Sequence, residues 1–187
     1  MNLFLKRLGG FYKYRFLMQQ LVTKDIKLKY RRSFLGYLWS ILNPLMVMVI
    51  MVIVFSNMFR SDIVNFPVYL IIGQTLYNFM SESTTQAIFS IIGNASLLKK
   101  TYVPKYVFTV SKITSSFVNM VFALGALVIV FVVCRVVPNV FYLFIPVILL
   151  QEYLFCLGLG MLLAQGCVFF RDIQHIYNAV LTAWMYL

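Results

Sequence analysis

The feature that most constrains this chain is a series of nearly uncharged windows, most of them long enough to cross a lipid bilayer. The windows are residues 33–59, 63–98, 113–134, 136–170 and 173–187. Only Glu82 and Glu152 interrupt them. A charge at the bilayer centre costs about 2.5–3.5 kcal/mol on insertion scales, so long uncharged windows indicate transmembrane helices. The pattern predicts an all-α polytopic membrane protein.

The windows set the expected spans and their number. We expect spans at about residues 36–58, 66–90, 108–134, 140–169 and 173–187. At 1.5 Å per residue the last of these reaches only about 22 Å, less than the hydrocarbon core of about 30 Å. We therefore expect four complete transmembrane helices and the start of a fifth. Residues 1–187 would form a single transmembrane domain that is incomplete at its C-terminal end, unless the last window is a short re-entrant or interfacial segment.

Composition and charge exclude a soluble protein and a nucleic-acid-binding protein. Hydrophobic residues make up 62% of the chain, against about 45–50% in soluble domains. The net charge is +11, but the basic residues gather in linkers: nine lie in residues 1–32 and four in residues 99–112. With Arg171 these linkers share one side of the membrane, and only Arg60 and Arg135 lie on the other. Cytoplasmic loops carry the excess of Lys and Arg, so we expect a cytoplasmic N-terminus and no nucleic-acid partner.

Residues 1–32 have the pattern of a helix that lies in the membrane plane. Lys6, Lys13, Lys24 and Arg31 are spaced by 7, 11 and 7 residues, which places them on one face of a helix. Met18, Val22 and Ile26 are among the apolar residues of the opposite face. The prediction is an amphipathic interfacial helix that contacts membrane lipids. The alternative is that these charges only set the topology and attract anionic lipids.

Polar residues within the spans are candidates for function. Glu82 and Gln86 belong to a polar run, residues 81–86, in the cytoplasmic third of the second span. Two interpretations remain open for them, a hydrated channel lining and hydrogen bonding between helices. Glu152 lies near the middle of the fourth span, where it could pair with Lys112 or a neighbouring Asn, be protonated or face the channel; we favour pairing or protonation over catalysis. The three cysteines lack metal-ligand spacing, so no metal site is expected.

Three stretches carry a resemblance to a known family. KDIKLKYRRSFLGYLWSILNPL at residues 24–45 has a fixed transition from basic to apolar residues. NASLLKKTYVP follows at residues 94–104, and FRDI at residues 170–173. In this order they resemble the ABC-2-type transporter permeases that export cell-surface polysaccharides such as O-antigen, capsule and teichoic acid. The resemblance extends over the whole chain.

The resemblance implies a six-helix subunit of the bacterial cytoplasmic (inner) membrane. It implies a homodimer around a polysaccharide channel and a separate ABC ATPase subunit as partner. The matching loop of the family is a coupling helix, which assigns ATPase coupling to Leu97, Leu98, Lys99, Lys100, Tyr102 and Pro104. An ordinary basic loop is the alternative. This chain has no G-x-x-x-x-G-K-[ST] phosphate loop, so we expect no cofactor in it, and ATP and Mg bound by the partner ATPase.

The expected function is that of a transport subunit without an ATPase site of its own. It would be the transmembrane permease of an ATP-driven exporter for a lipid-linked polysaccharide or a teichoic-acid-type polymer. Two alternatives stay open. One is a membrane-embedded enzyme acting on a lipid-linked sugar, and the other is a proton-coupled secondary transporter in which Glu152 carries the proton.

Overall fold

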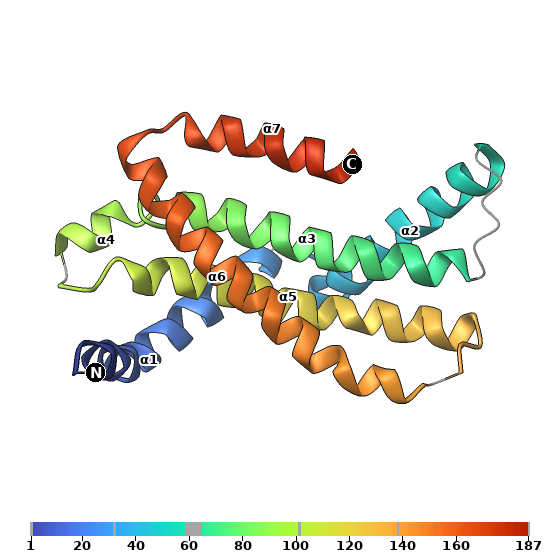
Figure 1. Cartoon of the computed structure of the whole chain (residues 1–187), viewed down its shortest axis with the longest axis horizontal. Coiled ribbons are helices and arrows are strands. Elements are labelled where there is room, and N and C mark those ends of the chain that lie inside the picture. The colour runs from blue at the N-terminus through green and yellow to red at the C-terminus, as the bar shows by residue number, and fades with distance from the viewer. Residues whose placement is uncertain (1, 32, 59–64, 101, 138, 187) are drawn as a thin grey trace.

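The computed structural model describes residues 2–31, 33–58, 65–100, 102–137 and 139–186, with side chains from residue 12 onward except at 56–58. The regular elements of this part of the chain are all helical (Figure 1). They are α1 (Asn2–Tyr30), the 3₁₀ turn η1 (Gly36–Leu38), α2 (Trp39–Met58), α3 (Phe66–Ser90), α4 (Ala95–Lys100), α5 (Tyr106–Val133), the 3₁₀ turn η2 (Val140–Phe144), α6 (Ile145–Phe169) and α7 (Ile173–Tyr186). The predicted all-α class is confirmed.

Each predicted span corresponds to an observed helix. The second prediction, residues 66–90, has the same bounds as α3, and α5 lies within two residues of the third. The first and fourth predicted spans each begin with a 3₁₀ turn that leads into the α-helix. Since local charge and turn residues mark these boundaries, the helix ends are readable from the sequence alone.

Three helical stretches of the described chain have both the length and the hydropathy of a membrane span: Gly36–Phe55, Tyr106–Val133 and Val140–Phe169. Helix α3 has 25 residues, long enough for a bilayer, but it carries the polar run that includes Glu82. Helix α7 has 14 residues. The roles of α3 and α7 as spans therefore stay predictions.

Helix α3 lies at the centre of the packing. It contacts α2, α5, α6 and α7, and α6 crosses α3 and α5 obliquely (Figure 1). At the crossing, Gly160 of α6 lies so close to its neighbours that an added Cβ would come within 2.7 Å of Ile113 Cδ1 on α5 and 3.0 Å of Ala87 Cβ on α3. This close approach is typical of membrane helix pairs, which pack through small residues.

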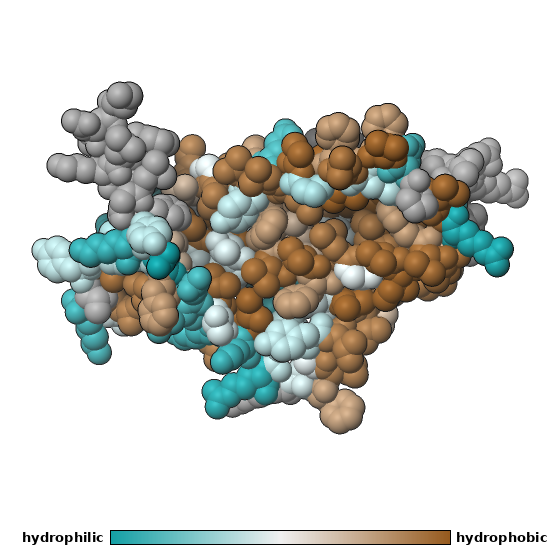
Figure 2. Space-filling model, turned by 90° about the horizontal axis from the view of Figure 1, so that it is seen from below, coloured by the Kyte–Doolittle hydropathy of each residue, from teal (hydrophilic) through white to brown (hydrophobic). Residues whose placement is uncertain are grey.

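The outer surface is apolar over a wide area. Large hydrophobic side chains such as Val132 on α5 and Leu162 on α6 are 73% and 69% exposed. Figure 2 shows hydrophobic residues over much of one face and hydrophilic ones gathered mainly at the end that holds α1. Soluble monomers rarely expose contiguous apolar patches of this kind, whereas lipid tails favour them. The protein is a multi-pass membrane protein.

Candidate functional site

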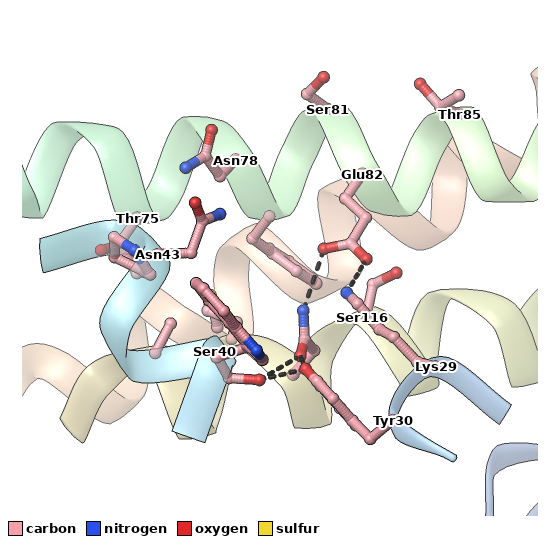
Figure 3. A pocket seen from close by; sticks show the side chains of 16 residues that line it. Lys29, Tyr30, Ser40, Asn43, Thr75, Asn78, Ser81, Glu82, Thr85 and Ser116 are labelled. Atoms are coloured by element: carbon pink, nitrogen blue, oxygen red, sulfur yellow. Dashed lines mark hydrogen bonds and ion pairs between the residues drawn. The ribbon is translucent and has the colours of Figure 1, made fainter. Parts of the chain in front are cut away.

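A polar cavity lies between the helices. Helix α3 contributes a stripe of polar side chains, from Thr75 through Asn78 and Glu82 to Thr85, at spacings of three or four residues. This spacing places them on one side of a helix. Figure 3 shows the lining of the cavity, whose volume is about 580 Å³. The lining residues are Lys29, Tyr30, Trp39, Ser40, Asn43, Pro44, Thr75, Asn78, Phe79, Ser81, Glu82, Thr85, Ser116, Asn119, Met120 and Ala123.

Most of the polar groups in this lining are neutral amides and hydroxyls. Each amide both donates and accepts hydrogen bonds, and each hydroxyl does the same. Ser116 of α5 is only 2% exposed, and its Oγ has no hydrogen-bond partner among the described residues. A buried polar group without a partner is costly, so this hydroxyl favours a hydrogen-bonding occupant in the cavity. The site is suited to a neutral ligand rich in hydroxyl groups.

Glu82 is the centre of a hydrogen-bond network at one side of the cavity. Lys29 Nζ at the end of α1 lies 2.6 Å from Glu82 Oε1, and the two side chains point toward each other in Figure 3. Gln86 Nε2 donates to the same oxygen at 3.0 Å, and Asn119 Nδ2 donates to Oε2 at 3.2 Å. Glu82 thus lines the cavity and joins α3 to α1 and α5, so it fits both interpretations that the sequence left open. Gln86 lies outside the cavity lining and supports the carboxylate.

Asn119 extends the network to α1 and α2. Its Oδ1 lies 2.5 Å from Tyr30 Oη and 3.0 Å from Ser40 Oγ, and the two hydroxyls are also within hydrogen-bond distance of each other, so their two protons are shared among the three contacts. These three residues were not among the sequence-based candidates. Asn119 could have been noticed in the sequence as an amide inside an uncharged apolar window, because polar groups in such windows commonly serve packing or function.

A second ion pair joins α1 to α5. Lys112 Nζ lies 2.9 Å from Asp25 Oδ1, and both side chains are partly buried. Lys112, one of the partners that the sequence left open for Glu152, is therefore paired with a carboxylate of α1 instead. Glu152 on α6 has one buried oxygen, Oε2, without a hydrogen-bond partner in the described part of the chain. Its protonation stays a prediction.

The other predicted residues lie at the end of the molecule that holds α4 and the start of α1 (Figure 1). Lys99, Lys100 and Tyr102 are exposed, and Leu98 and Pro104 are half-buried. Leu97 is 40% exposed. The loop therefore presents apolar and basic side chains together at the surface, while its coupling role stays untested.

The face pattern predicted for α1 agrees with the burial of its described side chains. Lys13, Lys24 and Arg31 are exposed, and Met18 and Val22 are half-buried. The side chain of Lys6 lies outside the described residues. Phe16 and Leu28 are exposed as well, so the amphipathic interfacial helix stays a prediction.

The described residues include no group of three or more His, Cys, Asp or Glu side chains placed to hold a metal ion. The chemistry that these residues offer is hydrogen bonding and ion pairing. Together, the apolar exterior, the helical spans and the hydrogen-bonding cavity between the helices define a polytopic α-helical membrane protein with a polar site among its helices.

Residues 17–187 match the family of ABC-2 type transporters, and the chain belongs to this family. It is 33% identical over 175 residues to the O-antigen export system permease protein RfbA of Myxococcus xanthus, a match that covers 94% of this chain and 67% of that protein. It is 30% identical over 163 residues to an RfbA of Klebsiella pneumoniae, covering 87% of this chain and 63% of that protein.

A less similar relative is named for the export of a different polymer. The capsule polysaccharide export inner-membrane protein CtrC of Neisseria meningitidis is 24% identical over 166 residues, covering 86% of this chain and 62% of that protein. The chain thus spans about two thirds of the length of these relatives. The matches confirm the family that the three sequence stretches indicated.

Proposed function

We propose that this chain is the transmembrane permease subunit of an ATP-driven exporter that moves a lipid-linked cell-surface polysaccharide across the bacterial inner membrane. The observation that carries this proposal is the polar cavity lined by Asn43, Asn78, Asn119 and several hydroxyl groups within a helical membrane protein. The names of the relatives, which are O-antigen and capsule export proteins, support the substrate class.

The cavity chemistry favours a neutral polymer over an ion. Sugar hydroxyls exchange their hydrogen bonds to water for bonds to amide and hydroxyl side chains, and their C–H faces pack on aromatic rings such as Trp39. Lys29 and Glu82 are the charged residues of the cavity lining, and they neutralise each other. O-antigen and capsule are the polymers that the relatives' names support, and a teichoic-acid-type polymer is the further candidate.

The energy source in this proposal is a separate ABC ATPase that binds ATP and Mg. The segment from Leu97 to Pro104 would contact it, because that segment presents apolar and basic groups at the surface. A second copy of the chain would complete the channel. The basic asymmetry of the linkers supports a cytoplasmic side for this loop and for the N-terminus.

Orientation is tested with single cysteines in a background without native cysteines. A cysteine at exposed Asn65, just before α3, should react with an impermeant thiol reagent on intact cells. A cysteine at Ser96 in α4 should react only after the membrane is opened. The reverse pattern would overturn the orientation and the proposed ATPase contact.

Export is tested with a matched pair of asparagine variants in a strain that lacks its own permease. Asn78 lines the cavity, whereas Asn178 is exposed on α7 and does not appear in the cavity lining. Asn78→Leu should lower the amount of surface polymer detected by antibody, and Asn178→Leu should leave it unchanged at equal protein levels. Normal export from Asn78→Leu, together with Asn43→Leu and Asn119→Leu, would remove the cavity from the transport path.

Proton-coupled transport is the second candidate, favoured by the unpartnered buried oxygen of Glu152. The two mechanisms differ in their response to Glu152→Gln. ATP-driven export should persist in this variant and should stop when the ATPase is inactivated. Loss of transport in Glu152→Gln, with an intact ATPase and normal protein level, would favour proton coupling.

A further inference from the structure

Two ion pairs extend from one side of α1, which supplies the acidic partner of one pair and the basic partner of the other. Asp25 and Lys29 are four residues apart, so they lie one above the other on the same helix face. Asp25 bonds Lys112 of α5 at 2.9 Å, and Lys29 bonds Glu82 of α3 at 2.6 Å. A single rigid element therefore holds one charged contact to each of the two central helices.

The second observation is a series of three adjoining cavities along α1. The polar cavity described above shares Lys29, Tyr30, Glu82 and Asn119 with a cavity of about 390 Å³ between α1, α3 and α5. That cavity shares Asp25, Leu28, Gln86 and Lys112 with a third one of about 430 Å³. Each ion pair thus lies at a junction between two cavities.

The series leads from the surface loop toward the interior. The third cavity reaches Gly93 and Asn94, which precede α4 at the basic end of the molecule. The first cavity reaches Thr75 and Ala123, which lie further along α3 and α5 from that end. All four residues shared at the inner junction are polar or charged, and so are three of the four at the outer junction, where Leu28 is the exception.

We propose that the C-terminal half of α1 is the gate of a polar access route that runs from the α4 end of the protein to the interior cavity. The Asp25–Lys112 pair closes the outer junction, and the Lys29–Glu82 pair closes the inner one. Both open together when this part of α1 moves away, because both contacts come from the same helix face. That the route admits the exported polymer from the cytoplasm rests on the proposed function.

The surroundings of the ion pairs allow the paired charges to separate at low cost. The side chains of the inner pair are 44% and 32% exposed, so water reaches the charges as they separate. Gln86 and Asn119 keep donating to Glu82 when Lys29 leaves, at 3.0 and 3.2 Å in the closed state. The carboxylate is therefore not left without partners, which lowers the barrier to opening.

The gate is tested by the reactivity of a cysteine inside the cavity. Ser116→Cys is placed in a chain whose Cys134, Cys156 and Cys167 are replaced by serine or alanine, in vesicles that expose the α4 side. A small charged thiol reagent is added, and the rate of modification is measured. Lys29→Glu should raise this rate roughly threefold to tenfold, because it removes a partly exposed ion pair and adds repulsion against Glu82.

Two controls separate gating from general damage. Lys27→Glu reverses an exposed charge two residues away on α1, outside all three cavities, and should leave the rate unchanged. Lys29→Glu combined with Glu82→Lys restores opposite charges and should return the rate to that of the parent. Equal rates for Lys29→Glu and the parent, or the same increase from Lys27→Glu, would overturn the proposal.

The measurement uses no polymer and no ATPase, so it stands apart from the proposed function. Glu82→Gln serves as the milder variant if Lys29→Glu does not insert in the membrane, and it should also raise the rate. A gate that responds as expected in a protein that exports nothing would refute the proposed function alone. Normal export combined with an unresponsive cysteine would refute the gate alone.

Discussion

Gly160 offers a sharp test of the packing between α6 and the two central helices. An added Cβ at this position would lie 2.7 Å from Ile113 Cδ1 and 3.0 Å from Ala87 Cβ, whereas carbon atoms in contact are normally about 3.5–4.0 Å apart. Both neighbours are fully buried, so neither has free space to move into. Gly160→Ala therefore forces the helices apart or strains the side chain of Ile113.

The control for this change is Gly158→Ala, two residues earlier on the same helix. An added Cβ at Gly158 meets nothing within 4 Å. Both variants gain the same preference of alanine over glycine in a helix, about 0.5–1 kcal/mol. The difference between their unfolding free energies therefore isolates the overpacking, which costs about 1–3 kcal/mol in well-packed cores.

The assay is reversible unfolding in mixed detergent micelles, followed by far-ultraviolet circular dichroism. Gly160→Ala should unfold at a lower denaturant fraction than the parent, and Gly158→Ala at an equal or higher one. Ile113→Val removes the Cδ1 atom, so Gly160→Ala with Ile113→Val should lose less stability than the sum of the two single changes. Equal stability for both glycine variants, or strictly additive losses, would refute the close crossing of α6 with α5.

Two further predictions concern α7 and the α4 loop. Tyr177→Phe should lower the unfolding free energy by about 0.5–1.5 kcal/mol, because the buried Tyr177 hydroxyl donates to Thr84 Oγ1 at 2.8 Å. The control is Tyr186→Phe at an exposed position, which should not change the unfolding free energy. Equal effects of the two changes would contradict the docking of α7 on α3. Leu98→Asp should abolish co-purification of the ATPase and export, since a buried leucine contributes about 1.5–3 kcal/mol and an exposed ion pair only about 0–1. Lys99→Ala should be mild, and normal export from Leu98→Asp with the ATPase bound would mean that this loop does not transmit work.

The helices could be predicted because particular residue types mark where each helix begins and ends. Asn65 and Pro67 precede the body of α3, and Gly93-Asn94 follows its end. Proline is favoured in the first turn of a helix, and glycine or asparagine just beyond the last. These signals act within a few residues, so the chain alone reveals them.

The site was only half predictable, because its partners come from distant parts of the chain. Glu82 and Gln86 stood out as polar residues inside a span. Lys29 belonged to a basic cluster that topology alone explains, and nothing local distinguishes it from Lys27. The packing of α1 against α5 brings Lys29 within 2.6 Å of Glu82, although both lysines are exposed.

The depth of each residue along its helix explains why Lys112 bonds Asp25 rather than Glu152. Lys112 is six residues from the start of α5, a rise of about 9 Å from the end of the molecule that carries α4. Glu152 is 17 residues from the end of α6 on the same side, a rise of about 26 Å. Long basic side chains extend toward the nearest interface rather than toward the membrane centre. An acidic residue on α1 is therefore the favoured partner for Lys112, and the same depth count applied to the sequence ranks Asp25 ahead of Glu152.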